Sequence, residues 1–290
     1  MERKRFLIAR AARLAAATAV LALLVAACGG SSSGGSSTTT SKAAAAKQSL
    51  GQLVSSGTLH FCSDISSPPL EFYKGGTQLT GSDIDLGDAI AGKLGLKAVW
   101  VNTAFSGIIP ALQAGHCDAI MSQLFDKPAR RAVVSFVDYM NSSEAVLVQK
   151  SNPQHISGID GLCGHPVAAE TGTTVTDYLK QVSQKCKAAG KPAIAVQTFL
   201  RDSDALEQLG LGHVQAYGTT LETGAYDMSK SGGQFAFAGK PFGQIPTGIA
   251  VRKNDTQLHQ AIAKAFAQIR SDGTYSSIMS KWGLSADMLK

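Results

Sequence analysis

The sequence has no motif that would identify an enzyme and no segment that would cross a membrane as a helix. It contains no GxSxG, HExxH or Walker loop, and no GxGxxG follows an expected strand. Its six histidines are scattered, with none beside a candidate nucleophile. The apolar segment over residues 14–27 is shorter than the ~20 residues that a transmembrane helix needs. A catalytic triad assembled from distant residues stays open, but no pattern favours one.

The chain also has little net charge outside its first residues, although the whole sequence carries a formal charge of +6. Residues 1–27 hold five basic side chains and one acidic, which leaves 22 basic against 20 acidic residues from residue 28 onward, a net charge of +2. This near-neutral body gives no indication of nucleic-acid binding. A hydrophobic fraction of 44% with 17% charged residues is typical of globular proteins, and 290 residues predict two lobes.

The first 27 residues predict a secretory signal, because a basic segment over residues 1–13 precedes the apolar segment over 14–27. The run LVAACG at residues 24–29 resembles the lipobox of bacterial lipoproteins, which implies cleavage before Cys28 and lipid modification of that cysteine. The alternative is an ordinary secreted protein with an unmodified cysteine. Residues 28–48, rich in Gly, Ser and Thr, predict a flexible tether. We therefore expect an exported, extracytoplasmic protein held at the membrane by its lipid, with a folded body from residue 49.

Cysteine is scarce, and apart from Cys28 the chain has four: Cys62, Cys117, Cys163 and Cys186. No CxxC pair occurs and no histidine stands at metal-ligand spacing, so we expect neither a metal site nor a cofactor. An exported protein lives where disulfides persist. Proximity predicts a Cys163–Cys186 bridge worth about 3 kcal/mol. The other two cysteines either form a second bridge or remain buried thiols.

Alternating strand and helix patterns in the body predict two α/β lobes, because strand–helix–strand units favour parallel pairing through crossover helices. Extended apolar segments at 145–150 and 247–253 predict a two-strand hinge, and an amphipathic C-terminal helix is expected to pack on the first lobe. We expect residues 49–143 with 246–290 in lobe 1 and residues 144–245 in lobe 2. The expected strands cover 58–62, 97–101, 117–122, 167–170, 193–199 and 214–217, and the expected helices 82–94, 107–114, 174–188 and 203–209.

Candidate site residues follow the strands, because ligands of open α/β sheets bind beyond the carboxyl ends of strands. Phe105 is either an apolar wall for a ligand or a core aromatic. Arg130 has the planar fork that receives a carboxylate, although a solvated arginine is the commoner outcome in such a turn. The run Gly172-Thr173-Thr174 either binds an anion or only begins a helix. Glu170 ends a strand at the cleft, where it would pair with a cationic ligand group or with a neighbouring basic side chain.

Ten short motifs follow one another along the body. They are SSPPLEF at 66–72, GSDIDL at 81–86, FSGIIPALQ at 105–113, CDAI at 117–120, PAR at 128–130, FVDY at 136–139, GTT at 172–174, TGIAV at 247–251, DGTY at 272–275 and KW at 281–282. Together they resemble the family 3 solute-binding proteins of ABC importers, the receptors for polar amino acids. The resemblance implies the type II periplasmic-binding-protein fold, in which two lobes with mostly parallel sheets close about a two-strand hinge, and no enzymatic turnover.

The resemblance also implies a site and its partners. Arg130 matches the arginine that grips the ligand α-carboxylate, with Thr174 and the amides after Gly172 assisting from the second lobe. The implied partners are a small amino-acid-like carboxylate and an ABC permease, and we expect a monomer. The remaining matches are Ser122 and Gln123 at the α-amino or carboxylate group, Phe105 as a ring stacked on the ligand, and Asp64 as an acid facing the ligand side chain.

Three positions depart from the family pattern. Thr220 stands where the family usually has the aspartate that pairs with the ligand α-ammonium. Ser67 replaces an aromatic residue, and Phe125 replaces Ser or Thr. Losing the acid removes a charge-assisted bond of roughly 1.5–3 kcal/mol unless another acid replaces it, for which the candidates are Glu170, Glu222 and Asp64. A ligand with a displaced, substituted or absent amine is the alternative.

Two other functions fit the same fold. The first is an enzyme resembling cyclohexadienyl dehydratase, with Glu170 as an acid. The second is a tethered sensor that passes lobe closure to a membrane partner.

Overall fold

The structure, a computed structural model, describes residues 50–290. The expected signal peptide and the whole expected tether, including Cys28, lie outside these residues. Between residues 50 and 290, none of the helices has both the length and the apolar character needed to cross a bilayer.

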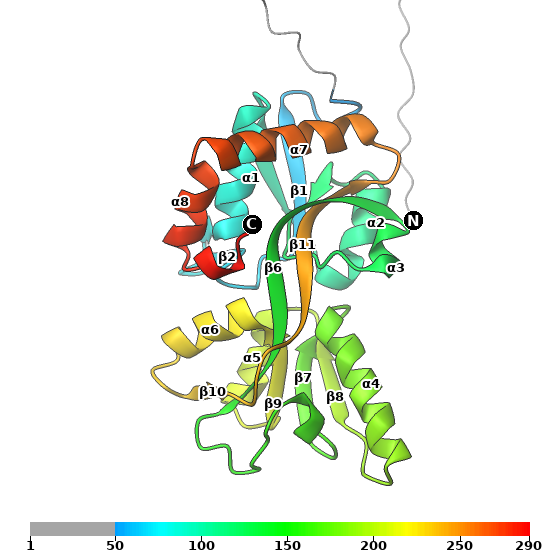
Figure 1. Cartoon of the computed structure of the whole chain (residues 1–290), viewed down its shortest axis with the longest axis vertical. Coiled ribbons are helices and arrows are strands. Elements are labelled where there is room, and N and C mark those ends of the chain that lie inside the picture. Colours follow the sequence, from blue (N-terminus) through cyan, green and yellow to red (C-terminus); the bar gives the residue numbers. More distant parts are fainter. Residues whose placement is uncertain (1–49) are drawn as a thin grey trace, which may run out of the picture. The chain divides into compact units, whose positions relative to one another are not determined.

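The first lobe contains a parallel three-strand unit in which β1 lies between β4 and β5. The C-terminal helices α7 and α8 pack on it through a core that includes Leu59, Leu86 and Ile262 (Figure 1). Its elements are β1 (Thr58–Ser63), β2 (Phe72–Lys74), β3 (Gln78–Thr80), α1 (Ser82–Lys93), β4 (Lys97–Asn102), α2 (Ile108–Gln113), β5 (Ala119–Ile120), α3 (Pro128–Arg131), α7 (Thr256–Ser271) and α8 (Thr274–Lys281).

The second lobe repeats this design, with β7 between β8 and β9 and all three strands parallel. Its core includes Val167, Leu179 and Ala216. Its elements are β7 (Pro166–Glu170), α4 (Thr174–Ala188), β8 (Ala195–Phe199), α5 (Asp202–Gly210), β9 (Ala216–Thr220), α6 (Leu221–Lys230) and β10 (Phe235–Phe237).

Two long strands, β6 (Val134–Gln149) and β11 (Phe242–Arg252), run from one lobe into the other and pair antiparallel (Figure 1). In the first lobe β11 pairs with β5, and in the second β6 pairs with β9. The strand order is therefore continuous, β4-β1-β5-β11-β6-β9-β7-β8, with β10 added beside β6. The predicted fold class is confirmed, with the hinge strands forming part of one mixed sheet.

Several elements differ from the expected ones. The hinge strands begin before the segments expected at 145–150 and 247–253, because the first half of β6 belongs to the first-lobe sheet and the first residues of β11 lie on the second-lobe side. The β2–β3 hairpin, α3, α6, β10 and α8 were not expected. Gly81 precedes the first turn of α1, and its φ of 143° places it against the carbonyl of Leu70, where a Cβ would clash.

Two disulfides join elements within the lobes. Cys163 and Cys186 are bonded across 23 residues of sequence, and Cys186 lies on α4. Cys62 on β1 is bonded to Cys117, which comes just before β5, across 55 residues. The structure thus contains the pair expected from proximity and, of the two alternatives for the other cysteines, the second bridge.

Candidate functional site

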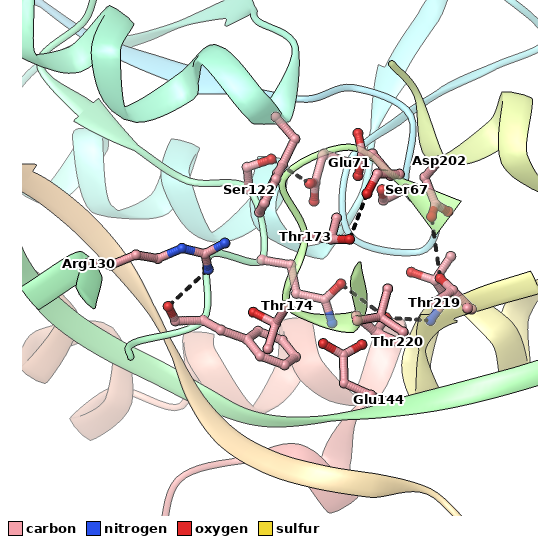
Figure 2. Close-up of a pocket in the computed structure, with 17 residues that line it drawn as sticks. Ser67, Glu71, Ser122, Arg130, Glu144, Thr173, Thr174, Asp202, Thr219 and Thr220 are labelled. Atoms are coloured by element: carbon pink, nitrogen blue, oxygen red, sulfur yellow. Dashed lines mark hydrogen bonds between the residues drawn. The ribbon is translucent and has the colours of Figure 1, made fainter. Parts of the chain in front are cut away.

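A pocket lies between the lobes and encloses about 450 Å³ of space, part of which is open to solvent (Figure 2). Both lobes and the hinge strand β6 contribute to its walls. The lining residues are Ser67, Glu71, Phe105, Ser122, Gln123, Phe125, Arg130, Glu144, Glu170, Thr173, Thr174, Val175, Asp202, Gly218, Thr219, Thr220 and Thr223.

Arg130 enters the pocket from α3 and is only 7% exposed. Its guanidinium donates to the carbonyl oxygen of Phe125 at 3.0 Å and, across the lobes, to that of Gly172 at 3.3 Å. The ring of Phe105 lies against it, with 5.3 Å between the Cζ and the ring centroid. Burial lowers the pKa of Arg130 to about 10, so the group remains charged at neutral pH. Arg130 is therefore a buried cation rather than a solvated surface arginine.

The turn before α4 faces Arg130 from the second lobe. Gly172 has a φ of 86° and lies so close to Ser106 that a Cβ would come within 3.0 Å of the Ser106 Cα. Thr173 donates its hydroxyl hydrogen to the carbonyl of Glu170, whereas the buried hydroxyl of Thr174 has no partner within residues 50–290. The first turn of α4 also leaves backbone N–H groups without helical acceptors. This end of the pocket suits an anionic group.

Gln123 connects the lobes beside the pocket. Its backbone has a φ of 41°, which is rare outside glycine, and its N–H donates to Asp83. Its side-chain amide donates to Glu222 at 2.9 Å, and its carbonyl accepts from the hydroxyl of Thr220 at 3.2 Å. Because both partners belong to the second lobe, the lobes are in direct hydrogen-bonded contact.

Thr220 has a structural role that the sequence did not indicate, since α6 was not expected. It is the N-cap of α6 and accepts a hydrogen bond from the N–H of Thr223 at 3.3 Å. On the neighbouring strand its partner in the β6–β9 register is Glu144. The position of the missing family aspartate thus lies beside another acid.

Three of the acids that line the pocket, Glu71, Glu144 and Asp202, were not among the predicted site residues. Each is at most 5% exposed. Burial is the main cause that raises the pKa of Asp202 to about 7 and the pKa of Glu71 and of Glu144 well above the ordinary range. Burial, followed by the charges of Asp64 and Asp202, does the same to the pKa of Glu170.

Asp64 and Glu222, a candidate for the replacing acid, are the predicted ligand contacts that are not part of the pocket lining, and Glu222 instead accepts a hydrogen bond from Gln123. The environment of Asp64 explains its place. Asp64 is 1% exposed, and its two oxygens accept hydrogen bonds from the hydroxyl of Ser66 at 2.7 Å and the N–H of Phe105 at 2.8 Å. Its carboxylate therefore holds the loop that carries Phe105. Arg201 of the second lobe lies 3.8 Å from it.

Ser122 accepts a hydrogen bond from the N–H of Asp64 and donates one to Glu71 at 2.9 Å, so its hydroxyl links the backbone of Asp64 to the carboxylate of Glu71. One of the missed residues had a usable signal, since Asp202 begins a helix just beyond β8, at the same sheet edge as Glu170. Glu71 and Glu144 had none, because the first lies in an irregular loop and the second within a hinge strand. Within residues 50–290 no group of His, Cys, Asp and Glu side chains is arranged to hold a metal ion.

The sequence matches bacterial extracellular solute-binding proteins, family 3, over residues 59–285. It is 29% identical over 238 residues to the arginine-binding protein ArgT of Corynebacterium glutamicum, covering 82% of this chain and 78% of the relative. A solved ancestral arginine-binding protein bound to arginine is 35% identical with a TM-score of 0.72, covering 78% of this chain and 98% of that one.

A second similar structure is the ancestral amino-acid-binding protein AncCDT-1, described as a precursor of cyclohexadienyl dehydratase. It is 32% identical with a TM-score of 0.70, and the match covers 78% of this chain and 95% of that one. Because the family model matches residues 59–285 and the two-lobed sheet agrees with it, the chain belongs to family 3 of the bacterial extracellular solute-binding proteins.

Proposed function

We propose that this protein is the receptor of an ABC importer and binds an amino acid between its lobes. The observation that carries the proposal is Arg130, a buried cation at the wall of the inter-lobe pocket. Within residues 50–290, two of its five N–H donors make hydrogen bonds, both to backbone carbonyls. The others are available to an α-carboxylate, which the guanidinium fork binds through two parallel bonds. Thr174 and the first turn of α4 complete this subsite from the second lobe.

We propose Glu144 as the partner of the ligand α-ammonium. Its carboxylate points into the pocket, and no hydrogen bond reaches it from the other pocket residues (Figure 2). It lies close enough to Arg130 for their charges to influence each other's pKa. With an acid beside the carboxylate subsite, the pocket carries both of the charges that complement the α-carboxylate and the α-ammonium of an amino acid. Glu144 then replaces the family aspartate from the strand next to Thr220.

Lobe closure explains how a receptor of this kind would signal that it is loaded. Contacts from both lobes meet around the pocket, including the Lys127–Asp177 ion pair at 2.6 Å and the rings of Phe72 and Tyr226, 5.5 Å apart. A ligand that binds residues of both lobes favours this arrangement by its differential affinity. The resulting closed surface is what a permease would recognise.

The ligand is tested with a thermal-shift panel of amino acids, opines, dipeptides and simple carboxylates, followed by titration calorimetry on each hit. An amino acid present at 100 times its dissociation constant should stabilise the protein by about 2.7 kcal/mol with a stoichiometry of one. The absence of a shift with every α-amino acid would contradict the proposal. Simple carboxylates that bind as tightly as amino acids would contradict the role of Glu144.

Membrane attachment through Cys28 is a separate proposal, supported by the sequence alone. We expect the wild-type protein in the membrane fraction as a monomeric lipoprotein and Cys28→Ala in the soluble extracytoplasmic fraction. Equal fractionation of the two proteins would contradict lipidation.

A dehydratase-like enzyme is the second candidate, favoured by the buried Glu170 in the pocket and the likeness to AncCDT-1. Incubation with prephenate and arogenate distinguishes the two functions. Product formation that is lost in Glu170→Gln would support the enzyme, and stoichiometric binding without product would support the receptor.

A further inference from the structure

The pocket holds more negative than positive groups. Four carboxyl groups line it, those of Glu71, Glu144, Glu170 and Asp202, against one lining cation, Arg130. A zwitterionic amino acid bound as proposed above uses Arg130 and Glu144 only. Three acids then remain at the other part of the pocket, and they need a partner.

We propose that Glu71, Glu170 and Asp202 form a subsite for a positively charged ligand side chain, so that the pocket selects amino acids with a second cationic group. This inference rests on the proposed function, because it extends the same pocket beyond the α-carboxylate and α-ammonium subsites.

Two of the three acids have oxygens that lack a partner. Glu71 is 1% exposed and Glu170 is 3% exposed, yet one oxygen of each accepts no hydrogen bond from an N–H or hydroxyl of the described residues. Each of the two lies against a further carboxyl group, that of Asp83 or that of Asp64. An unpaired carboxylate oxygen buried in this way costs free energy that a ligand cation would recover. Asp202 accepts at 3.4 Å from Thr219, which leaves it further capacity.

The protein itself offers this cluster little positive charge. The cation that lowers the pKa of Glu170 is Arg201, whose side chain is 42% exposed and lies 3.8 Å from Asp64. The charged and titratable groups that face the three acids are Asp64, Asp83, Arg201, Tyr217 and Asp227, together with the acids themselves. All but one of these charged groups are acidic, so the balance favours an added cation.

The acids come from both lobes, which links charge to closure. Glu71 lies on the first lobe, whereas Glu170 ends β7 and Asp202 follows β8 in the second. Closure brings like charges together unless a proton or a cation lies between them. A ligand with a cationic side chain therefore favours the closed form more than a neutral one of the same shape.

When the lobes close without that cation, protons take its place. The three acids have raised pKa values in this closed arrangement, with burial as the main cause, so closure favours their protonated forms unless a cation is present. At neutral pH the complex with a cationic side chain should thus hold fewer protons than the complex with a neutral side chain of the same shape.

L-arginine and L-citrulline provide the test, because they differ only in a terminal guanidinium against a neutral ureido group of nearly the same shape. Titration calorimetry at pH 7 in two buffers of different ionisation enthalpy gives both the affinity and the net number of protons exchanged on binding. We expect arginine to bind at least about tenfold more tightly, and citrulline binding to take up more protons than arginine binding.

Glu170→Gln and Glu144→Gln form a matched pair of isosteric variants. Glu170→Gln should reduce the arginine preference at least about threefold, whereas Glu144→Gln should weaken both ligands and leave their ratio unchanged. The comparison of arginine with citrulline on the wild-type protein tests the subsite even if neither variant folds.

Equal affinity for arginine and citrulline would overturn the cationic subsite while leaving the proposed function intact. An arginine preference with equal proton exchange for the two ligands would overturn the assignment to these three acids. Failure of both ligands and of every other amino acid to bind would overturn the proposed function, and this inference with it.

Discussion

Arg130→Ala should remove most of the affinity for any α-amino acid without unfolding the protein. Arg130 is 7% exposed and lies where two lobes meet, so a ligand carboxylate beside it would be largely withdrawn from water. Deleting the guanidinium leaves that carboxylate without a charged partner, which costs about 2–5 kcal/mol. The dissociation constant should therefore rise by a factor of about 30 to several thousand.

The same substitution should change the unfolding free energy of the ligand-free protein much less. It removes two hydrogen bonds, at 3.0 and 3.3 Å, each worth about 1 kcal/mol, and also the cost of burying a cation. Because these effects oppose each other, we expect a net change below about 2 kcal/mol. Denaturation without ligand therefore separates lost binding from lost folding.

Titration calorimetry with the best amino acid of the panel measures the effect, with Arg130→Lys as the matched control. Lysine keeps the charge but loses the fork, so its affinity should fall between those of the wild type and the alanine variant. An alanine variant that binds within about threefold of the wild type would refute the carboxylate subsite. The subsite would also be refuted if Arg130→Ala weakened a ligand that lacks a carboxylate by the same factor as it weakens the amino acid.

Three further predictions concern stability and the ammonium subsite. The Cys62–Cys117 bridge closes 55 residues of sequence, so the double variant Cys62→Ala, Cys117→Ala should have an unfolding free energy about 4 kcal/mol lower. Urea denaturation measures this change, and an unchanged midpoint and slope would contradict it. Burial raises the pKa of Glu222 from 4.5 to about 8, so its contribution to stability is full below pH 4.5 and is lost as the pH rises through about 8. Glu222→Gln should therefore flatten the decline of the melting temperature between pH 5 and 8, and a parallel curve would argue against it. Adding Thr220→Asp to Glu144→Gln should restore part of the amino-acid affinity, because the aspartate supplies a carboxylate and can still cap α6. Calorimetry measures the affinity, and no recovery would count against Glu144 as the ammonium partner.

The parts of the fold that the sequence predicted are those with a strong local pattern. Helix α4 occupies Thr174–Ala188 as expected, because its buried residues recur at helical spacing and a glycine turn precedes it. The hinge strands were expected too short, since their apolar residues serve two lobes in succession and no break marks the crossing. Helix α6 was missed because its first turn follows β9 directly, without a loop, and Thr220 ends the strand and caps the helix at once.

The candidate site was predictable where it follows the carboxyl ends of strands. Phe105, Gln123, Glu170 and Thr174 all line the pocket for that topological reason. Asp64 has the same topological position, yet its carboxylate is used by two neighbours and is not part of the lining. Which atoms of a strand-end residue remain free depends on hydrogen bonds between distant loops, and no local pattern records them.

In the site proposed above, the negative charge comes from Glu144 rather than from the position of Thr220. A threonine caps α6 as an aspartate would, so losing the acid at this position leaves the helix start intact. Its register partner on β6 lies across one ladder, and side chains paired in this way are roughly 5 Å apart at their Cβ atoms. An acid at that partner faces the same pocket, with a longer side chain to bridge the difference. The ammonium subsite proposed here therefore needs no change in the ligand class, only a change in the strand that supplies its carboxylate.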